Sequence, residues 1–176
     1  MMKDYLDGLL YQEFLRAMND NNSDIHAHLG ILRSFARACS SVTEFGVRDG
    51  QSTRAFLSVP GLKIRSYDLY LDPTVQKLFD ESNDDVNYII GDSLKIEIEQ
   101  TDLLFIDTDH THDQLYAELD RHHQKVNKYI IMHDTDIPYG LELLSAIMEF
   151  LSWNNQHWEV FYHTRTCHGL TVLKKK

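Results

Sequence analysis

Short apolar runs alternate with stretches of helical periodicity along most of the chain. The apolar runs are rich in aliphatic and aromatic side chains and are bounded by polar or glycine-containing segments, which is typical of buried strands. They predict seven strands, at Val42–Gly46, Ile64–Leu69, Val86–Ile90, Asp102–Asp107, Tyr129–His133, Trp158–His163 and Leu170–Leu173. The intervening segments repeat their apolar residues at helical spacing and predict helices at residues 52–58, 73–81, 112–126 and 140–152.

The alternation of strands and helices predicts an α/β fold with a doubly wound, seven-stranded, mostly parallel sheet. The strands at 102–107 and 129–133 are apolar almost without a break, as expected for strands that helices cover on both faces. The last two strands break the alternation, because a short turn near Thr166–Gly169 joins them. We therefore expect an antiparallel hairpin at the C-terminal edge of the sheet.

Two helices are predicted before the first strand, at residues 3–18 and 25–39, and Ser23 or Asp24 is expected to cap the second. A chain of 176 residues is long enough for one domain with a real core but not for two. We expect a single domain over residues 1–176. In that domain residues 1–40 form helices that cover the site, and residues 41–176 form the cofactor-binding core.

The composition argues against a nucleic-acid partner, a membrane-spanning segment and a signal peptide. There are 17 Lys and Arg against 27 Asp and Glu, a net charge of −10, whereas a nucleic-acid surface needs clustered cations. No apolar stretch could span a bilayer, and the N-terminus carries acids where a signal peptide has an apolar core. Cys39 and Cys167 lie far apart and predict no disulfide framework. We expect a cytoplasmic protein without nucleic-acid or membrane partners; a homo-oligomer stays compatible with the sequence.

A glycine-containing turn follows the first predicted strand, where open α/β sheets bind ligands. Gly46 and Gly50 allow a tight turn and a close approach of a ligand to the backbone. A dinucleotide fingerprint starting at Gly46 needs glycine where Arg48 and Gln51 stand. A P-loop needs lysine where Gln51 stands, so neither phosphate-binding loop fits.

Carboxylates follow several strands of the predicted sheet. Asp68, Asp92 and Asp107 stand at strand ends, and Glu44 lies just before the glycine turn. Acids without a lysine repel a pyrophosphate but suit a ligand that carries positive charge and ribose hydroxyls. S-adenosylmethionine (SAM), with its sulfonium and ammonium groups, meets this description. The alternative that each acid only caps a helix stays open.

The segment from Glu44 to Ser52, EFGVRDGQS, resembles the first motif of class I SAM-dependent methyltransferases. The likeness is strongest to the subgroup of catechol-type and sugar O-methyltransferases and cephalosporin hydroxylase-like proteins, and it covers residues 25–173. It implies a Rossmann-like methyltransferase fold and SAM as cofactor. The cofactor-binding residues that it implies are Glu44, Gly46, Gly50 and Ser52 toward the methionine part, Asp68 at the ribose, and Asp92 with Ser93 at the adenine.

A second group of polar residues follows the strands that end near Asp107 and His133. If these strands are neighbours, Asp107 and Asp134 converge, and two carboxylates with an oxygen or imidazole neighbour can hold Mg²⁺ or Mn²⁺. A bound cation makes a hydroxyl more acidic. His110 stands three residues after Asp107 and can take the hydroxyl proton as a general base. By contrast, the pair His122-His123, late on the helix predicted over 112–126, is expected to face solvent.

The spacing Asp107-x-x-His110 together with His133-Asp134 resembles metal-dependent sugar O-methyltransferases. That resemblance implies a metal bound by Asp107, His133 and Asp134, with His110 and Asp107 as the catalytic residues. The chain departs from the family at His133, where those enzymes often carry a second carboxylate, and at Thr135, where catechol-type enzymes carry asparagine.

The sequence therefore predicts methyl transfer to a hydroxyl of a small polar acceptor, with a sugar among the candidates, assisted by a divalent metal. Two other functions stay open: a non-catalytic binding or scaffold protein of the same fold, and a metal-dependent hydrolase. All three depend on where five residues lie in space. The methyltransferase hypothesis requires one common rim of the sheet for Gly46, Asp68, Asp92, Asp107 and Asp134.

Overall fold

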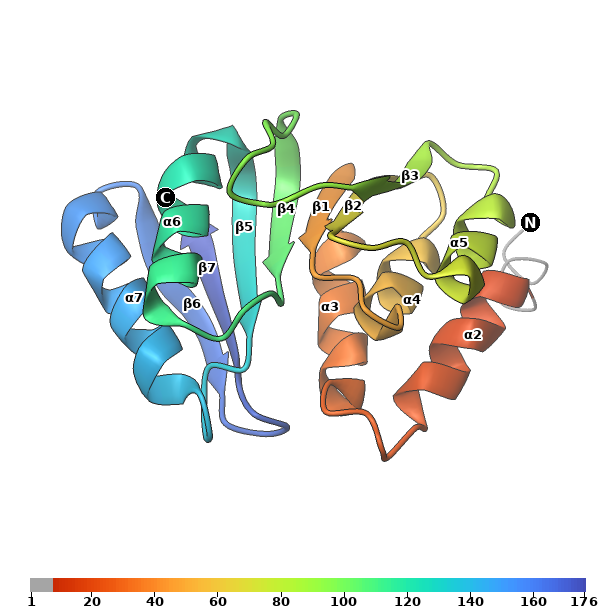
Figure 1. The fold of residues 1–176 in the computed structure, drawn as a ribbon, viewed down its shortest axis with the longest axis horizontal. Helices are drawn as coiled ribbons and strands as arrows, with labels where there is room; N and C mark the ends of the chain where they lie inside the picture. The colour runs from red at the N-terminus through yellow and green to blue at the C-terminus, as the bar shows by residue number, and fades with distance from the viewer. Residues whose placement is uncertain (1–7) are drawn as a thin grey trace.

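A seven-stranded sheet forms the centre of the structure, a computed structural model that describes residues 8–176 (Figure 1). The strand order is β3-β2-β1-β4-β5-β7-β6, and only β7 runs antiparallel to its two neighbours. The strands are β1 Ser41–Phe45, β2 Lys63–Asp68, β3 Val86–Ile90, β4 Thr101–Ile106, β5 Val126–His133, β6 Trp158–Thr164 and β7 Leu170–Lys175. The predicted fold class, including the antiparallel C-terminal hairpin, is confirmed.

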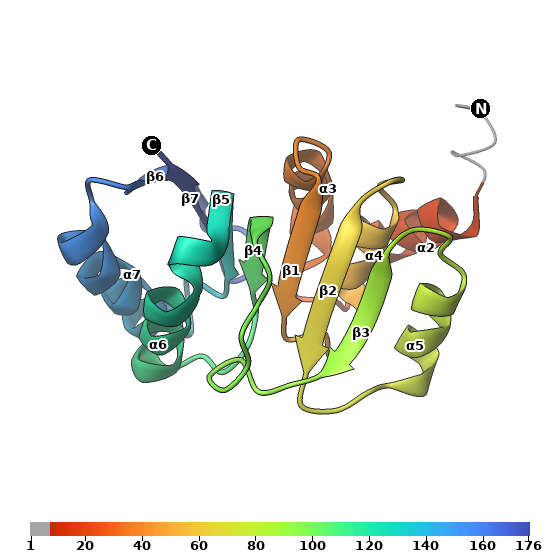
Figure 2. The same cartoon turned by 90° about the horizontal axis from the view of Figure 1, so that it is seen from above.

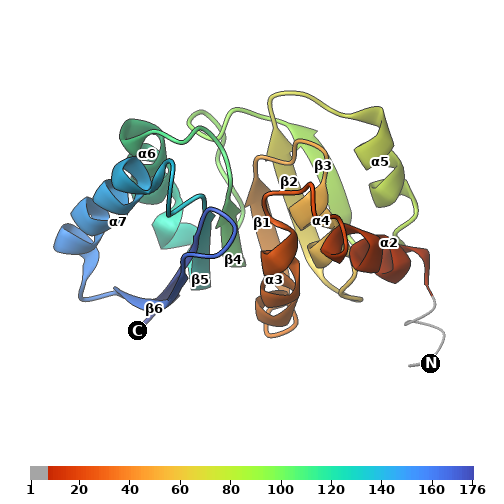
Figure 3. The same cartoon turned by 90° about the horizontal axis from the view of Figure 1, so that it is seen from below.

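Helices cover both faces of the sheet (Figures 2 and 3). One face carries α3, α4 and α5 with α2 beside them, and the other face carries α6 and α7. The helical elements are α2 Leu9–Met18, η1 His26–His28, α3 Leu29–Ala36, α4 Gln51–Leu57, α5 Pro73–Asp80, α6 His112–His122, η2 His123–Lys125 and α7 Gly140–Asn154. Within residues 8–176, none of the helices has the length and apolar character needed to cross a membrane.

Two hydrophobic cores follow from this layering, because successive residues of a strand point to opposite faces. Along β4, Leu103 and Phe105 belong to the core under α3 and α4. Their neighbours Leu104 and Ile106 belong to the core under α6 and α7. The nearly unbroken apolar run of this strand is thus explained by burial on both sides.

The predicted elements agree with the observed ones to within a few residues at most boundaries. The predicted helix over 25–39 is a short 3₁₀ turn followed by α3, which ends at Ala36. The strand predicted to begin at Tyr129 begins at Val126. The predicted helix over 3–18 is observed from Leu9, and its residues 3–7 lie outside the described part of the chain.

The turn after β1 lies directly against the turn after β4. Gly46 has a φ of +82°, and a Cβ on it would lie 1.8 Å from the carbonyl oxygen of Asp107. The backbone N–H of Asp107 donates to the carbonyl of Phe45, and the N–H of Gly46 donates to the carbonyl of Tyr67, both at 3.0 Å. Glycine is therefore required here both for the left-handed backbone and for the close approach of two main chains.

A buried carboxyl lies beneath this turn. Glu44 of β1 is 0% exposed and accepts hydrogen bonds from Ser52 and Thr53 of α4 and from Ser66 of β2. Burial raises the pKa of Glu44 to about 7, although the three hydroxyl donors oppose that rise. Glu44 thus joins β1, β2 and the start of α4.

Replacing Gly46 tests the contact between the two turns. We expect Gly46→Ala to lower the free energy of unfolding by about 3 kcal/mol or more, because backbone strain and steric overlap add. Gly61 has a φ of +72° with open space around it, so Gly61→Ala isolates the backbone strain and costs about 1 kcal/mol. Gly30→Ala, in α3, meets only a methionine methyl at 3.8 Å and is expected to be neutral or stabilising. Urea denaturation of the three variants checks this ranking; equal losses for Gly46 and Gly61 would contradict it.

Replacing Glu44 tests its protonation. The folded protein binds this proton more tightly than the unfolded chain, whose pKa is near 4.5, so folding loses stability as pH rises from about 4.5 to about 7. Glu44→Gln removes this dependence. Between about pH 4.5 and about pH 7, we expect the free energy of unfolding to fall by about 3 kcal/mol less in the variant than in the wild type. Urea denaturation near pH 4.5 and near pH 8 measures the two differences, and parallel pH profiles would show that Glu44 has no raised pKa.

Candidate active site

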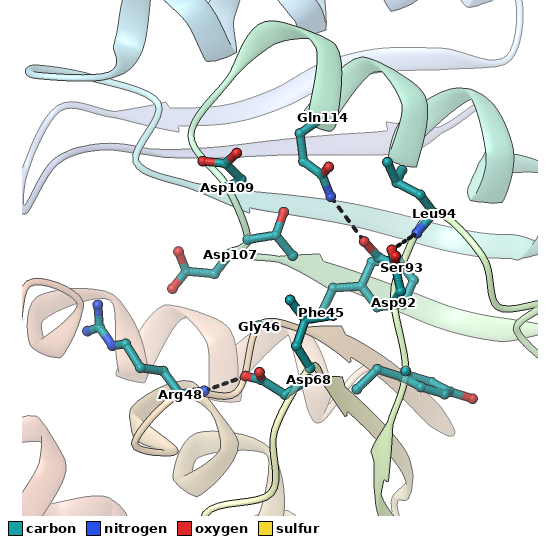
Figure 4. A pocket seen from close by; sticks show the side chains of 14 residues that line it. Phe45, Gly46, Arg48, Asp68, Asp92, Ser93, Leu94, Asp107, Asp109 and Gln114 are labelled. Atoms are coloured by element: carbon teal, nitrogen blue, oxygen red, sulfur yellow. Dashed lines mark hydrogen bonds between the residues drawn. The ribbon is translucent and has the colours of Figure 1, made fainter.

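A cavity of about 420 Å³ lies at the carboxyl ends of β1, β2 and β4, a volume typical of small-molecule sites (Figure 4). The loop after β3 and the start of α6 complete its walls. Its lining residues are Phe45, Gly46, Arg48, Tyr67, Asp68, Leu69, Gly91, Asp92, Ser93, Leu94, Asp107, Thr108, Asp109 and Gln114.

Five of the residues predicted from the sequence come together in this lining: Gly46, Asp68, Asp92, Ser93 and Asp107. The other three predicted cofactor residues lie behind it. The Ser52 hydroxyl donates a hydrogen bond to the Glu44 carboxyl at 2.6 Å beneath the turn. Gly50 immediately precedes α4, and its Cα faces Val75. These three residues do not line the cavity themselves; they adjoin the glycine turn, which does.

Asp68 holds the glycine turn and faces the cavity at the same time. Its Oδ2 accepts hydrogen bonds from the backbone N–H groups of Val47 and Arg48, both at 2.8 Å. Figure 4 shows the bond from Arg48. Its Oδ1 accepts only a longer bond, 3.3 Å, from the N–H of Tyr70. The carboxylate is therefore oriented by main chain, and Oδ1 retains capacity for a hydroxyl donor.

The loop after β3 forms the far wall of the cavity. The Oδ1 of Asp92 accepts from the N–H of Leu94 at 2.9 Å. The Lys95 ammonium, 2.7 Å from Oδ2, together with that N–H, holds the pKa of Asp92 below its usual range. Asp92 is therefore an anion at neutral pH, and it marks the end of the cavity away from Asp107 (Figure 4).

Glu118 of α6 supports this wall and was not anticipated from the sequence. It is 0% exposed, and Ser93, Thr108 and Gln114 all donate hydrogen bonds to its carboxyl. Burial raises the pKa of Glu118 to about 7 against the effect of these donors. The sequence feature that could have indicated its burial is its place between Leu115 and Leu119, on the apolar stripe of the helix.

The expectation that His122-His123 faces solvent is wrong. His122 is 1% exposed, and its Nε2 donates to the carbonyl of Ser93 at 2.7 Å. His123 is also buried, with its ring against Phe150. His122 is buried because the end of α6 lies against β1 and the loop after β3, whereas His123 is buried against α7. These tertiary contacts are not visible in the polar sequence of the segment.

An acid–imidazole cluster, made of Asp107, His110, His133 and Asp134, lies beside the cavity. Because β4 and β5 are adjacent and parallel, Asp107 and Asp134 follow them at the same edge. His110 Nε2 is 2.9 Å from Asp134 Oδ2 and 3.7 Å from Asp107 Oδ1. His133 Nδ1 is 3.1 Å from Asp134 Oδ2 and 3.5 Å from Asp107 Oδ1. The fifth rim residue, Asp134, thus adjoins the cavity through Asp107.

Attraction between the carboxylates and the imidazoles determines the direction in which the pKa values of this cluster shift. The carboxylates of Asp107 and Asp134 raise the pKa of His110 to about 9. Burial alone would lower the pKa of His133, but the same two carboxylates raise it to about 10. Burial alone would raise the pKa values of the two aspartates, but the imidazoles hold both below their usual range. The attraction therefore favours ionised carboxylates beside protonated imidazoles.

The β6–β7 turn and the segment before α3 close over the cluster, at the lower edge of the sheet in Figure 1. His133 Nε2 donates to the carbonyl of Cys167 at 3.1 Å, and His168 Nδ1 lies 3.1 Å from Asp134 Oδ1. His28 Nε2 donates to the carbonyl of Thr166 at 2.8 Å. Cys167 and His168 have positive φ values, +43° and +64°, which non-glycine residues seldom adopt. Sequence reasoning assigned no site role to His28 or His168, because only tertiary contacts bring them here.

The cluster has the chemistry of a divalent-metal site. Asp107, His110 and Asp134 each offer a ligand atom, and these atoms lie within 4.8 Å of one another. The Nδ1 of His133 is buried and close to both carboxylates, yet it is not aligned for a hydrogen bond with either. A buried nitrogen without a directed partner fits a ligand role, and the donors as a set suit Mn²⁺ at least as well as Mg²⁺.

No protein-family model matches the chain, and no curated protein matches it either. Solved structures do match. The methyltransferase PaMTH1 of Podospora anserina, bound to S-adenosylhomocysteine (SAH), has a TM-score of 0.65 at 15% identity, over 95% of this chain and 87% of that one. An O-methyltransferase of Bacillus cereus in complex with SAH also has a TM-score of 0.65 at 15% identity, over 99% and 96% of the chains.

An N-methyltransferase resembles the chain to a similar degree. The 1,6-didemethyltoxoflavin-N1-methyltransferase of Burkholderia thailandensis, with SAH bound, has a TM-score of 0.68 at 15% identity, over 99% of this chain and 85% of that one. These likenesses extend along nearly the whole described chain and include both O- and N-methyltransferases. At this identity they establish the fold: the chain has a Rossmann-like methyltransferase fold.

Proposed function

We propose that the protein is a SAM-dependent O-methyltransferase that acts on a hydroxyl of a small molecule. One observation carries the proposal. A cofactor-sized cavity holds Gly46, Asp68 and Asp92 in a row along the strand ends, and a cluster able to bind a hydroxyl adjoins its Asp107 end. The methyltransferase fold of the chain and the SAH bound in the three structural neighbours described above support this assignment.

The residues along the cavity suggest how the cofactor lies in it. The bare backbone at Gly46 gives the methionine part a close approach, and the Oδ1 of Asp68 is oriented to accept from a ribose hydroxyl. Asp92 and Ser93 then face the adenine at the far wall. In this assignment the turn that contains Gly46 is held in place by three residues that do not contact the cofactor: Glu44, Gly50 and Ser52.

The transfer itself is an in-line displacement. Bound SAM would supply the methyl group: the acceptor oxygen would attack the methyl carbon as the carbon–sulfur bond breaks, and the sulfonium would become a neutral thioether. The acceptor's proton passes to His110, which lies at the edge of the cluster with 28% of its side chain exposed. The enzyme contributes mainly by holding the oxygen, the carbon and the sulfur in line.

The acid–imidazole cluster has a defined place in this reaction. Asp107 and Asp134, with the Nδ1 of His133 beside them, would hold a divalent cation, which would supply charge that makes a nearby hydroxyl more acidic. The same two carboxylates raise the pKa of His110, so a cation held by them would weaken that effect, and the imidazole would act as the base. Asp107 belongs to both the cavity lining and the cluster, so it positions the acceptor against the cofactor.

The surroundings of His110 suit an acceptor with a ring. The Tyr139 ring lies 4.3 Å from the His110 ring, centre to centre, and Tyr139 is 41% exposed. A sugar presents both a C–H face for such a surface and hydroxyls for the cluster, so we keep a small polar ring compound as the acceptor.

Calorimetric titration with SAH tests the cofactor assignment. We expect one site with micromolar affinity in the wild type. Asp68→Asn should weaken binding about tenfold or more, because a hydrogen bond to a charged acceptor is lost. Asp80→Asn, an exposed change at the end of α5, is the matched control and should bind normally. Binding of Mn²⁺ without any binding of SAH would instead favour the metal-dependent hydrolase.

His110→Ala tests the base. We expect turnover, followed as SAH formation with a panel of small hydroxyl compounds, to fall about 100-fold or more, while SAH and Mn²⁺ still bind. The exposed His157→Ala serves as the control. Loss of Mn²⁺ binding would make His110 a metal ligand rather than the base. A wild type that binds SAH but methylates none of the panel would favour a non-catalytic binding protein.

A further inference from the structure

Glu118 has no part in the transfer just described, although its carboxyl accepts hydrogen bonds from three side chains that line the cavity. Its Oε1 accepts from the Ser93 hydroxyl at 2.6 Å and from the Gln114 amide nitrogen at 2.9 Å. The Thr108 hydroxyl is 2.9 Å from each of its oxygens. Each of these three donors lines the cavity, whereas Glu118 itself is fully buried behind them.

The direction of these bonds matters, because hydroxyl and amide groups can both donate and accept. An ionised carboxyl only accepts, so it draws the O–H of Ser93 and that of Thr108 toward itself. The Gln114 nitrogen has two N–H groups; one goes to Glu118 and the other to Ser93 Oγ, at 3.2 Å (Figure 4). All four side-chain hydrogens of this wall are thereby used. What the three side chains have left for a ligand is acceptors.

We infer that Glu118 is a positioning residue that makes this wall selective for a nucleobase edge that donates hydrogen bonds, such as the amino-bearing edge of adenine. The inference rests on the proposed function, which places the adenine beside Asp92 and Ser93. Glutamine at this position would have an N–H of its own. The hydroxyls and the Gln114 amide could then turn, and the wall would offer donors as well as acceptors.

A purely structural role accounts less well for this residue. Near neutral pH a buried carboxyl with a raised pKa destabilises the fold relative to an uncharged side chain of the same shape. A glutamine or methionine could fill the same space between Leu115 and Leu119. Once ionised, the acid differs from glutamine in being unable to donate and from methionine in accepting several hydrogen bonds, and both properties act on the groups that line the cavity.

The test compares SAH with S-inosylhomocysteine, in which an oxygen acceptor replaces the amino group of the adenine. Titration calorimetry near pH 8.5 keeps Glu118 ionised. We expect the wild type to prefer SAH by about tenfold or more, because an acceptor would face acceptors. Glu118→Gln should reduce the preference to about threefold or less. Asp120→Asn, which removes an exposed acid from the same helix, should keep the full preference.

A second variant guards against misfolding of the first. Gln114→Leu removes the amide without changing the buried carboxyl, and it too should reduce the preference; thermal denaturation confirms that each variant is folded. The inference is overturned if the wild type binds both compounds equally, or if both folded variants keep the tenfold preference. Absence of binding to either compound would overturn the proposed function itself, whereas equal binding to both leaves that function standing.

Discussion

The contact between the main chains at Gly46 and Asp107 organises the whole functional edge of the molecule. Because no side chain separates the turn after β1 from the turn after β4, the two strand ends lie as close as backbones can. Asp107 then borders two spaces: on one side the cavity that runs past Asp68 to Asp92, and on the other the acid–imidazole cluster. A side chain at position 46 would push these spaces apart and break the alignment on which an in-line reaction depends.

Buried acids surround this edge, and their partners decide what each can do. Glu44 and Glu118 are held by neutral hydroxyl and amide donors, so burial raises their pKa values to near neutrality. Asp107 and Asp134 are held by imidazoles, which keep their pKa values low and the carboxylates charged. Glu44 and Glu118 therefore hold the segments that line the cavity in place. Asp107 and Asp134 provide negative charge at the edge of the sheet.

The sequence predicted the architecture and the rim but not the support behind the rim. Strand ends can be read locally, since an apolar run that stops at Asp68 or Asp107 places an acid at one edge of a parallel sheet. Glu118 could not be assigned this way, because its role depends on a loop 25 residues away that brings Ser93 to it. The same holds for His28, which reaches a hairpin 138 residues away. Such pairings are set by packing of distant segments, and no local pattern encodes them.

The closing hairpin has a consequence for how the protein is made. β7 is the penultimate strand of the sheet in space but the last in sequence, and the turn before it completes the surroundings of His133 and Asp134. During synthesis the cavity-forming strands β1 to β4 emerge first and can associate early. The contacts of His133 and Asp134 with this turn form later, once β7 has been synthesised and has inserted between β5 and β6. The residues that line the cavity, all within 45–114, are therefore in place in the growing chain before the surroundings of the cluster are complete.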